Sequence, residues 1–165
     1  MMRILRISDT YSRHSELRNL PEADVLVHTG NFTLNGRQAE VFDFMEWLYR
    51  QPYKYKVFIA GKHDTWLYKN ELNIREPNCY NLRYSSVEIE GILFHGIPTF
   101  EHDLGEGGLF QKALAQIPQT TDALISNVQL TNNDFRLKPR LCLYGSKSKD
   151  WSVYELNKTS MTCEQ

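Results

Sequence analysis

Residues 55–66 read YKVFIAGKHDTW, a mostly apolar run of six residues followed at once by glycine and then by polar side chains. A short aliphatic and aromatic run of this kind is typical of a strand buried on both faces. Gly61 marks a turn, and the next three residues supply an amine, an imidazole and a carboxylate. The stretch therefore predicts a buried strand that ends in a polar loop, where open α/β sheets collect their functional residues.

The same abrupt change from apolar to polar residues occurs at four other places along the chain. These further predicted strands span residues 3–7, 24–28, 123–127 and 140–145. Residues 37–51 instead repeat Val41, Phe44, Met45 and Leu48 at helical spacing, which predicts a helix with one apolar face. The order strand, helix, strand indicates an α/β fold with parallel strands.

The second half of the chain adds an antiparallel element. Residues 87–97 form two apolar runs split by Glu90 and Gly91, which is the turn chemistry of a β-hairpin. The Gly-rich residues 96–110 predict a surface loop, and residues 109–117 predict a helix. No G-x-G-x-x-G phosphate-binding motif is present.

Composition indicates one domain without a strong electrostatic field. The chain has 165 residues, and 19 basic residues against 20 acidic ones give a formal net charge of -1. Nucleic acid and membrane are therefore not expected partners. Cys79, Cys142 and Cys163 lack metal or redox spacing, and the sequence begins without a leader pattern, so we expect free thiols in a cytoplasmic protein.

Polar loops follow five of the predicted strands. They read SDTYSRH (8–14), TGNFTLNG (29–36), GKHDTW (61–66), SNVQL (126–130) and GSKSKD (145–150). Taken in this order, the loops make the chain resemble the calcineurin-like metallophosphoesterases, whose motifs are D-x-H, G-D, G-N-H-D/E, a lone H and G-H-x-H. The resemblance implies a four-layer α/β/β/α sandwich of two mixed sheets over residues 1–157, followed by a tail at 158–165.

In that family the motif residues hold two divalent metals, such as manganese or iron with zinc, which bind phosphate oxygens and generate a hydroxide nucleophile. Here the corresponding positions are Asp9, Tyr11, Asn31, Lys62, Asn127, Ser146 and Ser148. Only Asp9 keeps the expected residue type, and a lysine ammonium is a hydrogen-bond donor that cannot ligate a metal. His63 and Asp64 match the pair that contains the family's general acid, and here they are vestigial. The sequence therefore predicts a metal-free protein.

Two alternatives concern the metal positions. Lys62 could form an internal ion pair with Asp9 in place of a metal, or it could be a solvated lysine in an open cleft; we expect the ion pair. His14, His63, His95 and His102 could belong to a changed metal site, whereas His28 and His95, which lie in apolar runs, are typical of satisfied core histidines. We expect no new site, because such metals need three or more convergent ligands.

Basic and aromatic residues around the former metal loops suggest a binding surface. The predicted partner-binding residues are Lys62, Arg136, Lys138, Lys147, Lys149, Trp66 and Trp151. Exposed aromatic and basic side chains commonly anchor protein interfaces. We expect a pseudoenzyme that binds a protein partner, either an acidic protein or a toxin enzyme, as a scaffold or as an antitoxin or immunity-type inhibitor.

Two other functions stay open at this point. One is a weak metal-dependent phosphodiesterase or phosphatase that uses Asp9, His63 and Asp64. The other is metal-free capture of a phosphate or nucleotide at Lys62 and Lys147.

Overall fold

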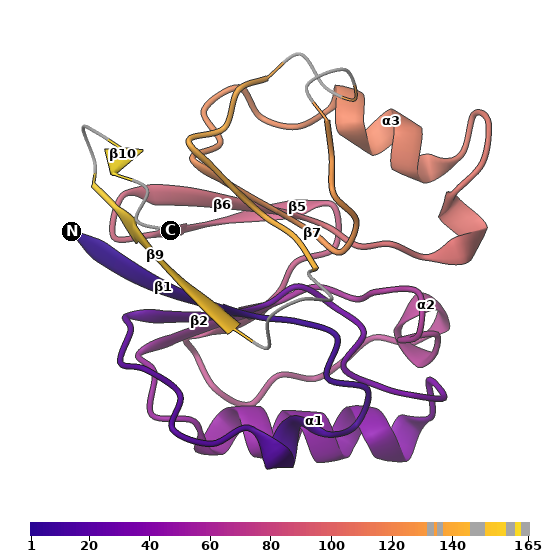
Figure 1. Cartoon of the computed structure of the whole chain (residues 1–165). Helices are drawn as coiled ribbons and strands as arrows, with labels where there is room; N and C mark the ends of the chain where they lie inside the picture. Colours follow the sequence, from indigo (N-terminus) through magenta and orange to yellow (C-terminus); the bar gives the residue numbers. More distant parts are fainter. Residues whose placement is uncertain (132–133, 135–136, 146–150, 158–160, 163–165) are drawn as a thin grey trace.

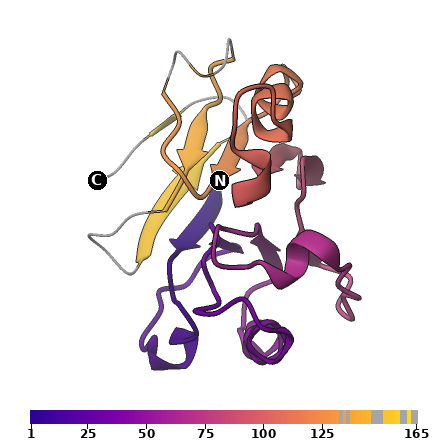
Figure 2. The same cartoon turned by 90° about the vertical axis from the view of Figure 1, so that its right-hand side faces the viewer.

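Two β-sheets packed face to face form the centre of the protein, and helices cover their outer faces (Figures 1 and 2). This computed structural model describes residues 1–131, 134, 137–145, 151–157 and 161–162. Within this range the order of layers is helix, sheet, sheet, helix. The architecture confirms the mixed-sheet α/β sandwich expected from the sequence.

The first sheet has six strands in the order β10-β9-β1-β2-β3-β4. Its parallel part consists of β1 (Met2–Ile7), β2 (Val25–His28), β3 (Tyr55–Phe58) and β4 (Cys79–Asn81). β9 (Trp151–Leu156) runs antiparallel to β1, and β10 (Met161–Thr162) runs antiparallel to β9. Two residues of the predicted tail therefore extend this sheet.

The second sheet has four strands in the order β5-β6-β7-β8. β5 (Ser85–Ile89) and β6 (Ile92–Ile97) form the predicted hairpin, and Glu90 and Gly91 have the positive φ angles, 49° and 80°, of a tight hairpin turn. β7 (Ala123–Ser126) and β8 (Leu141–Leu143) continue the sheet in parallel with β6. Parallel strands in both sheets end near one another at the same side of the molecule.

Three short or amphipathic helices complete the described fold. α1 (Gln38–Arg50) buries the predicted apolar face against the first sheet, and α3 (Leu109–Ala115) packs on the second sheet. α2 (Trp66–Lys69) follows β3. 3₁₀ turns span His14–Glu16 and Glu101–Asp103, so the expected loop at 96–110 contains the end of β6 and one of these turns.

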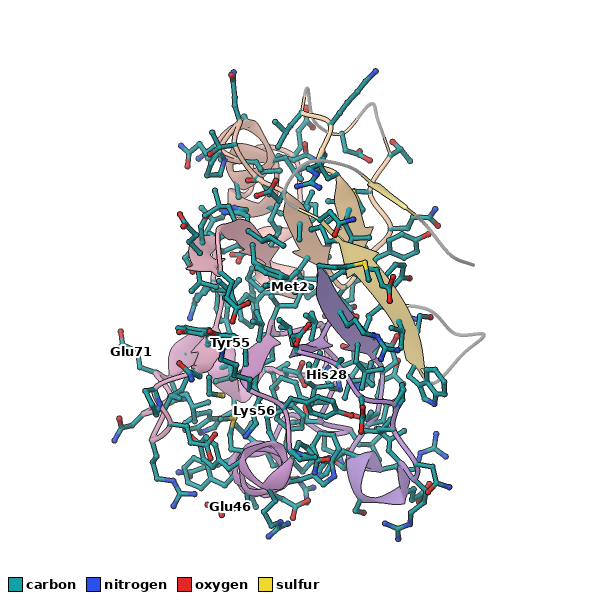
Figure 3. The ribbon with its side chains drawn as sticks, turned by 90° about the vertical axis from the view of Figure 1, so that its left-hand side faces the viewer. Met2, His28, Glu46, Tyr55, Lys56 and Glu71 are labelled. Carbon is teal, nitrogen blue, oxygen red and sulfur yellow. The ribbon has the colours of Figure 1, made fainter. Side chains whose placement is uncertain are left out.

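Three apolar clusters separate the layers. The central cluster joins the inner faces of both sheets through residues such as Val27, Val57, Phe94 and Ile125. In Figure 3, Lys56 points from β3 toward α1, where its Nζ donates to the carbonyl of Tyr49 and pairs with Glu76, while Glu46 lies on the outer face of the helix. Within the described residues no helix is long and apolar enough to cross a membrane.

Candidate functional site

The candidate site lies where the carboxyl ends of β1, β2, β3, β7 and β8 come together. The loops after β1 and β2 are joined by backbone bonds, including Asp9 N–H to the Gly30 carbonyl at 3.1 Å. The two sheets are joined by Asn127, whose Nδ2 donates to the Thr29 carbonyl and whose own carbonyl accepts the Gly145 N–H. The topology therefore brings together the loops on which the motif resemblance depends.

Two glycines are required by the close approach of these loops. Gly30 has a φ of 100°, and a Cβ there would lie 2.7 Å from the backbone nitrogen of Gly61. A Cβ on Gly145 would lie 2.7 Å from the Asn127 carbonyl oxygen and 2.9 Å from Asp9 Oδ2. These contacts explain both glycines by loop packing alone, since neither requires a bound metal.

Asp64 braces the loops from inside the protein. Its fully buried carboxylate accepts the backbone N–H groups of Asn31, Gly61 and Thr33 and the Thr33 hydroxyl, at 2.7–2.9 Å. Burial raises the pKa of Asp64 to about 6, although these hydrogen bonds act in the opposite direction. All of its polar contacts hold the loops together, and none points into an open cleft.

Asn31 occupies the centre of the site. Its Nδ2 donates to Asp9 Oδ1 at 2.7 Å and to Asn127 Oδ1 at 3.2 Å, while its Oδ1 accepts the His63 N–H. A backbone N–H can only donate, so the side-chain oxygen must face His63 and the amide NH₂ must face Asp9. The Nδ2 group of Asn31 thus lies between Asp9 Oδ1 and Asn127 Oδ1 and donates to both.

Tyr11 and Ser8 complete the surroundings of Asp9. The Tyr11 hydroxyl donates to Asp9 Oδ1 at 3.4 Å, and the Ser8 hydroxyl donates to Oδ2 at 3.0 Å. Partial burial, and then the charge of Asp9, raise the pKa of Tyr11, so the phenol stays protonated. Asp9 is therefore satisfied by neutral donors.

The predicted ion pair between Lys62 and Asp9 is wrong for the part of the chain that the structure describes. Lys62 is exposed and forms no ion pair there. The amide of Asn31 and the hydroxyls of Tyr11 and Ser8 already supply hydrogen-bond donors to the carboxylate, so the lysine is not needed to satisfy its oxygens. The other reading of Lys62, a solvated side chain at the mouth of the site, agrees with this geometry.

His63 lies at the mouth next to Tyr11, and the two ring centroids are 4.9 Å apart. Its Nδ1 is 2.8 Å from the Leu34 carbonyl, which accepts only, so Nδ1 carries a proton. Nε2 has no partner among the described residues, and the side chain is exposed.

The remaining predicted partner residues are dispersed. Trp66 begins α2 beside the site, and Trp151, 41% exposed, begins β9 opposite Ile7 at the end of β1. Lys138 is exposed and lies two residues before Arg140, which pairs with Asp122 at the amino end of β7, the end opposite Asn127. Arg136, Ser146, Lys147, Ser148 and Lys149 lie outside the described residues.

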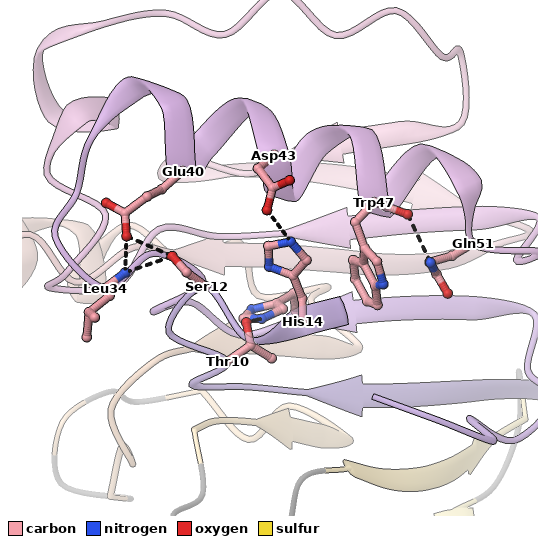
Figure 4. A network of polar contacts seen from close by, with 9 residues as sticks. Thr10, Ser12, His14, Leu34, Glu40, Asp43, Trp47 and Gln51 are labelled. Carbon is pink, nitrogen blue, oxygen red and sulfur yellow. Dashed lines mark hydrogen bonds and ion pairs between the residues drawn. The ribbon is translucent and has the colours of Figure 1, made fainter. Parts of the chain in front are cut away.

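Histidines below the loops have structural roles. His28 is fully buried, accepts the Gly30 N–H at Nδ1 and contacts the Thr10 hydroxyl through Nε2, so burial lowers its pKa to about 3. His14 contacts Asp43 on α1 (Figure 4), and burial also lowers its pKa. His95 is buried against the Ser86 hydroxyl, which confirms that it and His28 are satisfied core histidines.

Sequence reasoning missed Glu40, which holds the loop at residues 34–37 beside the site. Glu40 accepts the Ser12 hydroxyl and the Leu34 N–H (Figure 4). It also accepts the N–H groups of Asn35 and Arg37. Partial burial opposes ionisation, but these bonds together lower the pKa of Glu40 to about 2. A glutamate at the third position of a helix is a known capping signal, and it could have identified this role.

In the part of the chain that the structure describes, the donor set does not fit the two divalent metals that the resemblance implies. Among the described residues no group of three or more histidine, cysteine or acidic side chains could hold a metal ion. More directly, an N–H group of Asn31 and the O–H group of Tyr11 point at Asp9 Oδ1. A cation there would face hydrogen-bond donors instead of lone pairs.

The two-sheet sandwich with polar loops at the carboxyl ends of its strands defines a metallophosphoesterase-like fold. Metallophosphoesterase domain-containing protein 1 of Homo sapiens is 30% identical over 156 residues, covering 76% of this chain and 48% of that protein. UPF0046 protein C25E10.12 of Caenorhabditis elegans is 31% identical over 160 residues, covering 81% of this chain and 56% of that protein. The chain belongs to the calcineurin-like metallophosphoesterase family.

Two further findings limit what can be inferred from the similarity to known proteins. A 70-residue match, 40% identical, to the probable rhamnogalacturonate lyase C of Emericella nidulans covers 42% of this chain and 6% of that protein. No family model matches the chain. The chain spans about half the length of the two metallophosphoesterase-like relatives, so their fold is shared over that part.

Proposed function

We propose that this chain is a catalytically inactive metallophosphoesterase-like protein that binds another protein through its former active-site face. In this role it serves as a scaffold or as an antitoxin or immunity-type inhibitor of a partner enzyme. The function needs no metal, because the loops are held by hydrogen bonds. The family's hydrolytic chemistry depends on residue types that this chain has replaced.

One observation carries the proposal: Asn31 Nδ2 donates to Asp9 Oδ1 at 2.7 Å and to Asn127 Oδ1 at 3.2 Å. A neutral amide with two N–H groups satisfies both oxygens without adding charge. An aspartate at this position would instead place a second carboxylate beside Asp9, and the repulsion would have to be relieved by a cation or by protonation of one of the two. The amide therefore supports a site that is stable without metal.

The experiment measures metal content and turnover of the purified chain. Mass spectrometry should find less than stoichiometric manganese, iron and zinc after gel filtration. A generic aryl phosphodiester, bis(p-nitrophenyl) phosphate, should not be hydrolysed above background in millimolar manganese chloride. Stoichiometric metal together with metal-dependent turnover that Asp9→Asn abolishes would contradict the proposal.

His63 supports a second candidate, a weak phosphodiesterase that uses one metal. Its proton sits on Nδ1 against the Leu34 carbonyl, which leaves Nε2 available at the mouth as a base or, when protonated, as an acid. Asp64 does not support this candidate, because its carboxylate is buried and fully hydrogen-bonded. Turnover that His63→Asn removes, while Asp9→Asn removes bound metal, would favour the enzyme.

A further inference from the structure

The chain contains a single Asn-Gly pair, Asn35-Gly36, in the loop between β2 and α1. Every other asparagine of the sequence precedes a residue that has a side chain. Asparagine is one of the chemically labile residue types, because the main-chain nitrogen of the next residue can attack its side-chain amide carbon. Glycine leaves that nitrogen unshielded, since it has no Cβ. Asn35 is therefore the asparagine at which this reaction meets the least steric hindrance.

The hydrogen bonds of Glu40 leave the attacking nitrogen free. The Glu40 carboxylate accepts the main-chain N–H groups of Leu34 at 2.9 Å, Asn35 at 3.1 Å and Arg37 at 3.0 Å. Among the described residues, no acceptor is hydrogen-bonded to the N–H of Gly36, which lies between them. The fold thus holds the loop through the neighbours of Gly36 and leaves the Gly36 nitrogen without a partner in the described chain.

The Asn35 side chain is also free to rotate. It is exposed, and within the described part of the chain no hydrogen bond holds its amide away from the main chain. Asn31 differs, because its buried amide donates to Asp9 and Asn127. The amide carbon of Asn35 can therefore approach the next nitrogen, whereas that of Asn31 is held in place.

The fold requires glycine at position 36. Gly36 has a φ of 66°, and a Cβ there would lie 2.6 Å from the carbonyl oxygen of His63. A residue with a side chain would have to displace the loop after β3 before it could shield the nitrogen. The residue that the loop needs is thus the residue that makes Asn35 labile.

We propose that Asn35 is a site of spontaneous deamidation. The Gly36 nitrogen attacks Cγ of Asn35 and gives up its proton, the bond from Cγ to Nδ2 breaks, and Nδ2 leaves with that proton as ammonia. The product is a five-membered succinimide ring. One water molecule then opens the ring at either carbonyl and restores the N–H. Opening gives aspartate, or isoaspartate, in which the main chain runs through Cβ and Cγ. No atom changes oxidation state, so water is the sole co-reactant.

The isoaspartyl product weakens the hold of Glu40 on the loop. The additional main-chain atom falls between the Asn35 N–H and the Arg37 N–H, both of which Glu40 accepts. A new carboxylate also appears near that of Glu40, which is ionised because its hydrogen bonds lower its pKa to about 2. We therefore expect the loop to lose some of these bonds. Leu34, whose carbonyl accepts His63 Nδ1, is then held less firmly.

Peptide mapping tests the proposal. The purified chain is incubated at 37 °C and pH 8 and digested with trypsin. Cleavage after Arg18 and Arg37 places Asn19, Asn31 and Asn35 in one peptide. We expect fragment ions to locate the mass gain of deamidation at Asn35, and an isoaspartyl methyltransferase to methylate the product.

The other two asparagines of this peptide serve as internal references. Asn19 is exposed and has a positive φ of 54°, but it precedes Leu20, and Asn31 is buried. Both should stay intact while Asn35 is converted. A synthetic peptide with the sequence of residues 31–40 measures the reaction without the fold.

Two variants separate the chemistry from its consequence. Asn35→Gln would have to close a larger ring, so it should show neither the mass gain nor methylation, and its unfolding midpoint in urea should not change. Asn35→Asp carries the new charge on an ordinary main chain. We expect the isoaspartyl form, isolated by ion exchange, to unfold at lower urea than Asn35→Asp and to exchange the amide hydrogens of residues 34–37 faster.

Three results would overturn the proposal. In the first, Asn35 stays intact in the chain over the time in which the synthetic peptide is converted. In the second, Asn19 or Asn31 is modified as fast as Asn35. In the third, the isoaspartyl form has the same unfolding midpoint and the same exchange at residues 34–37 as the unmodified chain. The inference does not depend on the proposed function, since the reaction needs neither a metal nor a partner.

Discussion

The substitution Asn31→Asp probes the centre of the site most directly. It replaces the N–H that donates to Asp9 Oδ1 at 2.7 Å by a carboxylate oxygen. Loss of a hydrogen bond to a charged group costs about 1.5–3 kcal/mol. Two unit charges about 4 Å apart add about 4 kcal/mol at an effective dielectric constant of about 20. Because solvent reaches Asp9 and screens part of this repulsion, we expect the free energy of unfolding to fall by about 3–5 kcal/mol at pH 8.

The assay is urea denaturation followed by circular dichroism at pH 8 in EDTA. The control is Asn19→Asp, an exposed position with a similar positive φ of 54° and no carboxylate partner among the described residues. Added manganese should raise the unfolding midpoint of Asn31→Asp, because a dication compensates the two carboxylates, and should leave the original chain unchanged. An Asn31→Asp variant as stable in EDTA as the control would refute the reasoning.

Three further changes test the supports of the site. Asp64→Asn places an NH₂ group against backbone donors and should lower the free energy of unfolding by about 2–4 kcal/mol, measured by urea denaturation; an unchanged midpoint would contradict the bracing role. Gly145→Ala should cost about 1–3 kcal/mol by overpacking, whereas Gly105→Ala, where a Cβ meets open space, should cost less than about 0.5 kcal/mol in the same assay. His28 has a pKa of about 3 when folded and about 6.5 when unfolded, so below pH 6.5 the unfolded state alone gains the proton and stability falls by about 1.4 kcal/mol per pH unit. His28→Gln should remove that part of the slope between pH 6.5 and 3, and parallel pH profiles for the two proteins would contradict the assignment.

The sequence predicted the strands that form continuous apolar runs, even where the strand is only three or four residues long. Residues 55–60 correspond to β3 because Val57 and Phe58 are fully buried between layers. β4 was missed because Cys79–Asn81 forms no apolar run and is held by pairing with β3, and α2 was missed because four residues are too few to show a helical period. Tertiary contacts define such elements.

The site was predicted in part. Motif order placed Asp9, Asn31, Asn127 and Gly145 together, and the structure brings them into contact. The prediction of a Lys62–Asp9 ion pair was wrong because residue types do not reveal which donor lies next to a carboxylate in the folded chain. The Asn31 amide lies closer to Asp9 than Lys62 does and hydrogen-bonds to it. Asp64 was assigned to vestigial chemistry, although its role in bracing backbone N–H groups depends on a loop geometry that residue types alone do not specify.

The hydrogen bonds of the Glu40 carboxylate determine which side chains beside the site can be substituted. The carboxylate holds the loop at residues 34–37 through main-chain N–H groups, which every residue except proline provides. Side chains at Leu34, Asn35 and Arg37 can therefore change while the loop keeps its path, much as antibody loops change on a constant framework. A library randomised at these three positions with Glu40 retained would present new recognition surfaces on an unaltered scaffold.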